Sequence, residues 1–375
     1  MQGSQICQIS SEGAVVDACY TLAGDKVATC SSTGAIQVWS CATAEPSWDL
    51  LHEEELPDQP SQLAWCHPEH GEVLAVGTAS GAVHILQGPP PFSSSSSSSS
   101  SSGHAHNGWQ QHSREGWGVA GKLHTGQGAV SALAFAPRQQ GLALAVGCSS
   151  SPGAAAAPQL GGSLGSRSSV LVFEAAGVVG QQLQWTLLGK IQLPGEAGSC
   201  HCLCWREAAA GLPPLLAVGH SRGGGVWAYQ QPSMQWKELC LLPVPPGGHQ
   251  QQLQALHWAP ALGQPRELLA ASFGSTVALY SLSPTASLND AGDGPQQQQL
   301  LGLQAELIAE LAHPVPVWKL EFNFLGNTLG CSLDGVPELW FWMARMGEHE
   351  EWHVVSKIKG ITDVKDQSAD DHMLD

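Results

Sequence analysis

The sequence has 375 residues, with 15 Lys and Arg against 32 Asp and Glu, and its formal net charge is −17. Such a charge repels phosphate backbones and anionic lipids, so we expect no direct binding to nucleic acid or to a membrane surface. Only 13% of the residues are charged, whereas Gly (43) and Pro (24) are numerous and Trp (14) outnumbers Tyr (3) and Phe (7) together. This composition predicts an all-β protein of turns and short strands.

The sequence contains eleven cysteines, which raises the question of disulfides. The first residues, MQGSQICQIS, lack the basic and apolar regions of a signal peptide, so we expect reduced thiols in an intracellular compartment. No apolar run approaches the roughly eighteen residues that cross a bilayer, and we therefore expect a soluble protein.

One three-strand pattern is repeated six times along the chain. Each copy has an alternating apolar run, a turn, a short run of small and apolar residues, a Gly-containing turn and a third alternating run. This pattern predicts three antiparallel strands joined by hairpins. The copies begin near Ala14, Ser61, Gly128, Cys200, Leu253 and Val315. An insertion at about 150–168 interrupts the third copy in a hairpin, where extra length costs little free energy.

A fourth alternating segment follows each copy and is predicted to be the outer strand of a blade. These segments are Trp48–Leu56, Trp117–His124, Trp185–Leu193, Trp236–Val244, Gln304–Ala312 and Trp352–Lys359. A seventh candidate, Gln5–Ile9, precedes the first copy. Six blades need only six outer strands, so one strand is surplus. The sequence thus predicts an open six-bladed β-propeller over residues 1–360 with a surplus N-terminal strand.

An unpaired strand exposes hydrogen-bonding edges, which proteins cover or use to pair with a partner's strand. We therefore expect a partner to complete the propeller in trans. The predicted partner-binding residues are Ile6 and Ile9 on the surplus strand and Val354 and Ile358 near the end of the last blade.

Three segments have too little apolar character to offset the entropy cost of ordering. We expect residues 93–115, which include an unbroken serine tract, and residues 150–168 to be disordered loop insertions. Residues 361–375 are expected to form an acidic disordered tail.

The segment Gly219–Gly223 matches the G-x-S-x-G pattern of a hydrolase nucleophile elbow. That motif needs a helix after the turn, and the residues that follow alternate like a strand. We predict that the protein is not an enzyme and has no catalytic residue, with a hydrolase that uses Ser221 as the alternative.

Four possible zinc ligands lie close together at Cys200, His201, Cys202 and Cys204. On a strand they alternate between faces, and no second ligand pair lies nearby in the sequence. We predict that the cysteines pack as small core residues, and that the protein holds no metal and no cofactor.

Several aromatic residues fall at repeated positions. Six tryptophans inside predicted strands are expected to pack in the core: Trp39, Trp65, Trp205, Trp258, Trp318 and Trp340. Three histidines just before first strands are expected to anchor turns by hydrogen bonds: His124, His249 and His313.

The repeats resemble degenerate WD repeats. The Trp-Asp position holds Trp39-Ser40 in the first blade, and the Gly-His position is filled at Gly248-His249. Within that family, several segments are similar to the Sec-thirteen-homologue nucleoporins, in matching order from Val15 to about Gly360. They are ATCSSTGAIQVW from Ala28, AWCHPEHGEVLA from Ala64, AFAPRQQGLALA from Ala134, HWAPALGQPRELLA from His257 and VWKLEFNFLGNTLG from Val317.

This resemblance implies an open WD-repeat propeller completed in trans by a blade from an α-helical scaffold nucleoporin. It implies a non-enzymatic scaffold in the outer-ring Y-complex of the nuclear pore, with further Y-complex subunits as partners and a role in nucleocytoplasmic transport of mRNA and protein. Two related alternatives are the cage propeller of a vesicle coat at the endoplasmic reticulum and a subunit of a nutrient-sensing complex at the vacuolar or lysosomal membrane. A closed, peptide-reading propeller that needs no partner is a third.

Overall fold

The structure is a computed structural model, and part of the chain is described. The described residues are 9, 12–41, 48–89, 116–149, 169–179, 182–193, 198–207, 213–230, 233–246, 252–260, 266–285, 302–345 and 351–360. The segments predicted to be disordered, 93–115, 150–168 and 361–375, lie outside these residues. So do residues 5–8 of the predicted surplus strand, whereas Ile9 is half-buried and has no strand assignment.

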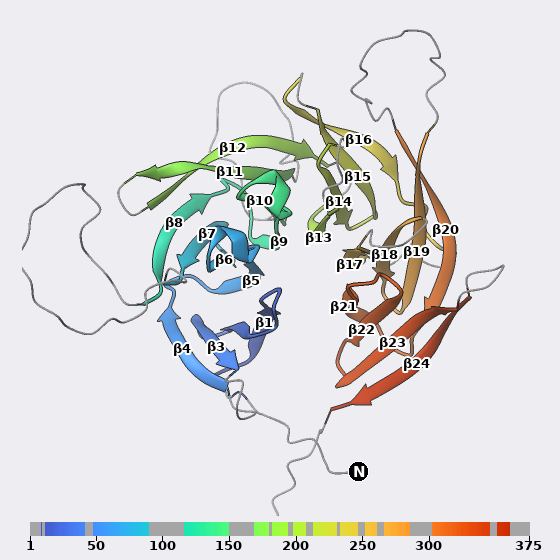
Figure 1. Ribbon diagram of the computed structural model, residues 1–375, viewed down its shortest axis with the longest axis horizontal. Coiled ribbons are helices and arrows are strands. Elements are labelled where there is room, and N and C mark those ends of the chain that lie inside the picture. Colours follow the sequence, from blue (N-terminus) through green and yellow to red (C-terminus); the bar gives the residue numbers. More distant parts are fainter. Residues whose placement is uncertain are drawn as a thin grey trace, which may run out of the picture. The chain divides into compact units, whose positions relative to one another are not determined.

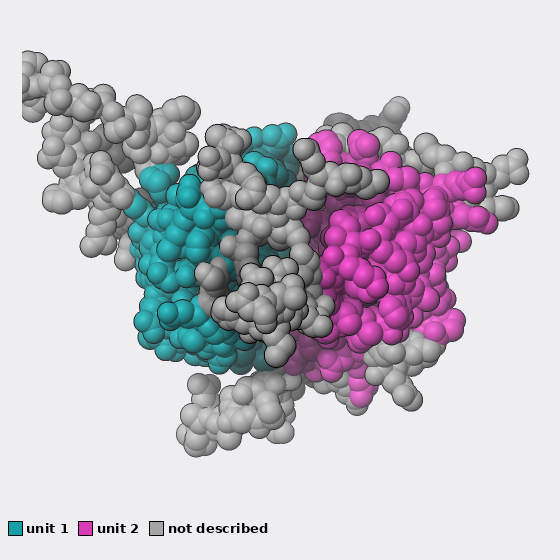
Figure 2. All heavy atoms as spheres, turned by 90° about the horizontal axis from the view of Figure 1, so that it is seen from below, with its two compact units in different colours: residues 1–193 teal, residues 194–375 magenta. Residues whose placement is uncertain are grey.

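Six four-stranded antiparallel sheets follow one another along the chain (Figure 1). Each sheet, here called a blade and numbered in chain order, contains four consecutive strands. The chain divides into two compact units, residues 1–193 with blades 1–3 and residues 194–375 with blades 4–6 (Figure 2). This repetition is the architecture of a six-bladed β-propeller.

The strands of the first unit are β1 (Val15–Tyr20), β2 (Lys26–Ser31), β3 (Ala35–Cys41), β4 (Trp48–Glu55), β5 (Pro60–Trp65), β6 (Val73–Thr78), β7 (Ala82–Gln87), β8 (Gly118–His124), β9 (Val130–Phe135), β10 (Ala143–Cys148), β11 (Ser169–Val179) and β12 (Gln182–Gln192). Two short 3₁₀ helices, η1 (Pro68–His70) and η2 (Arg138–Gln140), lie between first and second strands of blades 2 and 3. Among the described residues, no helix has the length and apolar character to span a membrane.

The strands of the second unit are β13 (Cys200–Trp205), β14 (Leu215–His220), β15 (Gly223–Gln230), β16 (Gln235–Leu241), β17 (Leu253–Trp258), β18 (Glu267–Phe273), β19 (Thr276–Pro284), β20 (Leu303–Ala312), β21 (Val317–Phe322), β22 (Thr328–Leu333), β23 (Glu338–Arg345) and β24 (Glu351–Lys359). The six predicted three-strand copies and their outer strands are all confirmed. The insertion at 150–168 falls in the hairpin between β10 and β11, as predicted.

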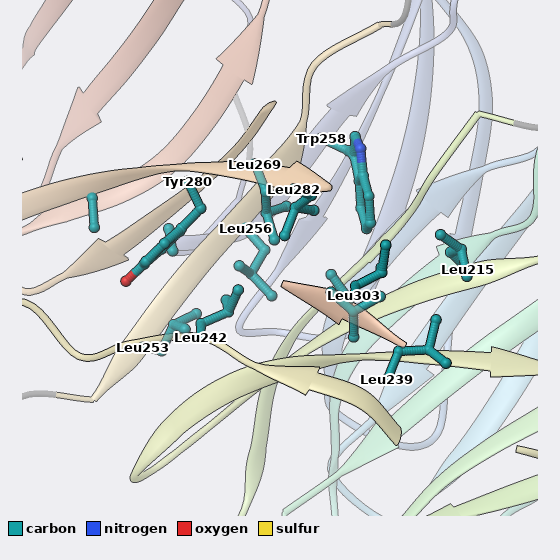
Figure 3. Packing of buried hydrophobic residues seen from close by; sticks show 14 of the residues in the cluster. Leu215, Leu239, Leu242, Leu253, Leu256, Trp258, Leu269, Tyr280, Leu282 and Leu303 are labelled. Carbon is teal, nitrogen blue, oxygen red and sulfur yellow. The ribbon is translucent and has the colours of Figure 1, made fainter. Parts of the chain in front are cut away.

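The apolar core of the second unit lies between the flat faces of neighbouring blades. Leu242, which follows β16 of blade 4, packs with Leu253, Leu256 and Tyr280 of blade 5 (Figure 3). The Tyr280 hydroxyl donates a hydrogen bond of 2.5 Å to the Pro243 carbonyl oxygen. Blades 4 and 5 are therefore each stabilised chiefly by the face of the next blade, because apolar burial between the sheets supplies the largest favourable free energy.

Side chains on the first strands also join neighbouring blades by hydrogen bonds. In the first unit, Asp17 on β1 accepts a bond of 2.9 Å from the backbone N–H of Leu63 on β5. The same carboxylate accepts the backbone N–H of Ala18 at 2.9 Å. Asp17 is 4% exposed, so these bonds replace the water that the carboxylate loses on folding.

In the second unit the acceptors are less polar. The backbone N–H of Trp258 on β17 lies 3.2 Å from Cys204 Sγ on β13. The backbone N–H of Phe322 on β21 donates to His257 Nδ1 on β17 at 3.2 Å. Burial lowers the pKa of His257 to about 4, which keeps the imidazole neutral and Nδ1 free to accept.

We expect Asp17→Ala to lower the free energy of unfolding by about 1–3 kcal/mol, because the Leu63 N–H is left buried without its acceptor. Asp49→Ala, at an exposed position of β4, is the control and should change it by less than about 0.5 kcal/mol. Chemical denaturation of both variants measures the difference. Equal effects would show that the inter-blade bond does not stabilise the unit.

His257 should make stability depend on pH. An unfolded histidine has a pKa near 6.5, so the unfolded chain binds this proton before the folded chain does. The contribution is fully present above pH 6.5 and is lost as the pH falls toward the folded-state pKa of about 4. Between pH 7 and 5 we expect the wild-type chain to lose about 2 kcal/mol more than His257→Gln. Parallel losses in urea titrations would contradict this assignment.

Candidate partner-binding face

Blade 6 has one face that packs on blade 5 and one that no other blade of its unit covers. Pairing across the four strands sets the rows of side chains on this second face, here called the uncovered face. The rows are Lys319, Ser332, Leu339 and Ile358, then Glu321, Gly330, Phe341 and Ser356, then Thr328, Met343 and His353.

The same ladder in blade 5 shows what this kind of face normally meets. In blade 5, Ser272 pairs with Val277, which pairs with Leu311. The equivalent residues of blade 6, in the same order, are Ser332, Leu339 and Ile358. Val277 and Leu311 are 0% and 2% exposed because blade 6 covers them.

In blade 6 the equivalent side chains are accessible. Ile358, which corresponds to Leu311, is 54% exposed, and Met343 on the same face is 36% exposed. Val355, at a bulge of β24 beside this face, is 44% exposed. Leu339 and Phe341 are half-buried. The uncovered face therefore carries accessible apolar side chains among polar ones, on a sheet that packs against blade 5 with its other face.

The outer strand β24 borders the uncovered face and, among the described strands, pairs with β23 alone. Lys359 on this strand bonds Glu338 at 3.0 Å, and the Lys357 ammonium lies 3.3 Å from the centre of the Trp340 ring. Lysines on an edge strand discourage unspecific pairing with other sheets, so the apolar face, and not the edge by itself, is the selective feature.

The four predicted partner-binding residues have different surroundings. Ile358 lies on the uncovered face, whereas Val354 is half-buried and pairs with Trp342 on the side that packs against blade 5. Ile6 lies outside the described residues, and Ile9 is half-buried. No observation tests their role in binding, which stays a prediction.

Sequence reasoning missed Leu339, Phe341 and Met343, which make up much of this face. The run ELWFWMAR in β23 carried the signal, since large apolar residues at both odd and even positions indicate that both faces of a strand are to be buried. Trp318 was predicted to pack in the core, and that was wrong. It is the extra residue of a bulge in β21 and is 46% exposed.

Blade 1 also has one face packed against a neighbouring blade and one face with exposed apolar side chains. On the side away from blade 2, Val15, Tyr20 and Leu50 are 54%, 61% and 45% exposed. The centre of this side is polar, because Gln37 is buried there and donates to Glu53 at 2.8 Å. Its Oε1 is buried without a hydrogen-bond partner.

The catalytic alternative at Ser221 lacks the geometry of a nucleophile elbow. Ser221 lies in the turn between β14 and β15, so a strand follows it where the motif needs a helix. Its hydroxyl lies 2.9 Å from His201 Nε2 and accepts the backbone N–H of Ser199 at 3.3 Å. These bonds tie the turn to β13.

The cysteines of β13 pack as the sequence predicted. Cys202 and Cys204 lie against the core cluster between blades 4 and 5, and Cys200 is buried. Burial raises the pKa of Cys204 to about 11 and that of Cys202 well above its ordinary value, so both are poor nucleophiles. None of the ten cysteines in the described part of the chain is in a disulfide.

His313 forms the structural hydrogen bonds expected of it. It is buried, its Nδ1 lies 3.1 Å from the Leu311 carbonyl oxygen, and its Nε2 accepts the Trp342 indole N–H at 3.0 Å. Burial lowers the pKa of His313, in agreement with a neutral ring that accepts at Nε2. His124 is exposed, and His249 lies outside the described residues.

Comparison with known proteins gives the chain's relatives. Nucleoporin seh1 of Schizosaccharomyces pombe is 25% identical over 356 residues, covering 89% of this chain and 91% of the relative. The protein transport protein SEC13 of Mycosarcoma maydis is 28% identical over 359 residues, covering 88% and 89%. Human nucleoporin SEH1 is 22% identical over 355 residues, covering 92% and 85%. The chain's homologues are Seh1- and Sec13-like WD-repeat proteins.

The solved structures agree on the fold. The Chaetomium thermophilum Sqt1 propeller, solved bound to the N-terminus of the ribosomal protein L10, is similar with a TM-score of 0.56 and 16% identity. The match covers 94% of this chain and 76% of that one. No protein-family model matches the sequence. The six-bladed all-β propeller predicted from the repeats is thus confirmed.

If the uncovered face is accessible in solution, truncating Ile358 should cost little. We expect Ile358→Ala to change the free energy of unfolding of the chain by less than about 0.5 kcal/mol. Leu311→Ala, the matched change on the covered face of blade 5, should cost about 2–5 kcal/mol. Denaturant titration compares the two, and a similar cost for both would mean that something already covers Ile358.

Proposed function

We propose that the chain is a non-enzymatic scaffold propeller whose blade 6 binds a β-blade donated by an α-helical scaffold nucleoporin. The carrying observation is the contrast between buried Leu311 in blade 5 and 54% exposed Ile358 at the equivalent position of blade 6. A sheet that covered this face would stabilise the complex by about 25 cal/mol for each Å² of apolar surface buried. The nucleoporin names of several homologues support the choice of partner.

In this proposal the chain works at the nuclear envelope, within the outer ring of the nuclear pore. It joins the donor nucleoporin to further Y-complex subunits and so supports transport of mRNA and protein. The partner's blade supplies apolar side chains that cover Leu339, Phe341 and Ile358.

A second candidate is a propeller of the vesicle-coat cage at the endoplasmic reticulum. It is favoured by the SEC13 relatives, which are named protein transport proteins and are 26–28% identical to this chain. The uncovered face serves equally well in both, so the identity of the donor separates them.

The test is co-expression with the α-helical scaffold nucleoporin of the same organism and, in parallel, with its α-helical coat subunit. Size-exclusion chromatography with mass detection should give a stable one-to-one complex with the nucleoporin. Ile358→Asp should weaken that complex at least about 100-fold, because a charge buried against apolar groups costs several kcal/mol.

Met234→Asp is the matched control, since Met234 is 66% exposed in a turn with a positive φ that Asp tolerates. It should bind as the wild-type chain does. A complex with the coat subunit alone would favour the second candidate. A monomer indifferent to both partners, or a complex that Ile358→Asp leaves unchanged, would overturn blade donation at this face.

A further inference from the structure

The first strands of blades 4, 5 and 6 share a register that identifies equivalent residues. Each of these strands has a one-residue bulge near its start. The third residue after the bulge pairs with a small residue of the second strand. At this position Cys204 pairs with Ala217, His257 with Ala270 and Glu321 with Gly330. We call it the third-position residue of the first strand.

In blades 4 and 5 the third-position residue does the same thing. Cys204 Sγ lies 3.2 Å from the backbone N of Trp258, the fourth-position residue in blade 5. His257 Nδ1 accepts from the backbone N of Phe322, the fourth-position residue in blade 6, at 3.2 Å. In both blades the third-position side chain therefore accepts a hydrogen bond from the backbone N–H of the fourth-position residue in the next blade. Because the donor is a backbone group, the bond does not depend on that fourth-position residue's own side chain.

In blade 6 the third-position residue is Glu321, on the uncovered face. Its side chain is exposed, whereas Cys204 and His257 lie against the following blade. Beside it Gly330 leaves room, since a Cβ built there would come no closer than 3.6 Å to any atom. Gly330 therefore places no side chain beside Glu321 that would hold a covering strand away.

The chemistry of Glu321 suits this task. A carboxylate accepts hydrogen bonds about twice as strong as those to a neutral acceptor. A sheet that covered the carboxylate without supplying a donor would leave it buried and unsolvated, which is strongly unfavourable. Ala64 occupies this position in blade 2, which packs on blade 3, so packing of two blades does not require an acceptor here.

We infer that Glu321 is a docking residue that accepts the backbone N–H of the fourth-position residue on the innermost strand of the partner's blade. The inference rests on the proposed function and deepens it. It commits the partner to a first strand in the same orientation as β17 and β21, with a residue other than proline at that position, because proline has no N–H.

The experiment measures the dissociation constant of the complex between the full chain and the co-expressed α-helical nucleoporin. Glu321→Ala should weaken binding about 10- to 100-fold, the range for a lost hydrogen bond to a charged group. Glu321→Gln keeps an acceptor oxygen and should weaken it by less than about tenfold. Glu238→Ala, at an exposed position of β16, is the control and should bind as the wild-type chain does.

Proline substitution at the partner's fourth-position residue completes the test. This substitution should strongly weaken binding to the wild-type chain. It should weaken binding to the Glu321→Ala variant little further, because the two changes remove the same hydrogen bond. Wild-type affinity for Glu321→Ala, or equal losses for the Ala and Gln variants, would overturn the role of Glu321 while the complex itself stands. If the wild-type chain forms no complex, the proposed function and this inference both fail.

Discussion

A four-stranded sheet with apolar residues on a face is stabilised when another sheet covers that face. This constraint organises each unit of the protein. Leu242 of blade 4 is covered by Leu253 and Tyr280 of blade 5, and blade 5 in turn buries Val277 and Leu311 against blade 6. The last sheet of the series, blade 6, has the same kind of face and no further blade in its unit to meet it. Its accessible apolar side chains, Leu339, Phe341, Met343 and Ile358, are the physical basis for a binding role.

Inter-blade hydrogen bonds make this packing specific. Apolar faces could slide past each other, because burial is not directional. Acceptors such as Asp17 and His257 fix the register of neighbouring first strands by binding backbone N–H groups. In the proposed complex, Glu321 extends the series to a face where the neighbour is another chain. Affinity then comes from the apolar side chains and register from the carboxylate.

Much of the fold could be predicted from the sequence because the repeat is local. Alternation, Gly turns and small-residue runs reveal six triplets, and tryptophan-led segments such as Trp236–Val244 reveal the outer strands. The binding face was harder to predict. Whether Leu339 or Trp340 points toward blade 5 depends on register, and a one-residue shift moves every side chain to the other face. The exposure of Trp318 was equally hard to predict, because it depends on a bulge that shifts the register of β21.

The most direct test is hydrogen–deuterium exchange of the chain alone and with the α-helical nucleoporin. The account predicts that binding slows exchange in β21, β23 and β24, whose residues carry the uncovered face, and leaves β14 and β15 of blade 4 unchanged. Protection confined to other blades, with β23 and β24 exchanging as in the isolated chain, would contradict it.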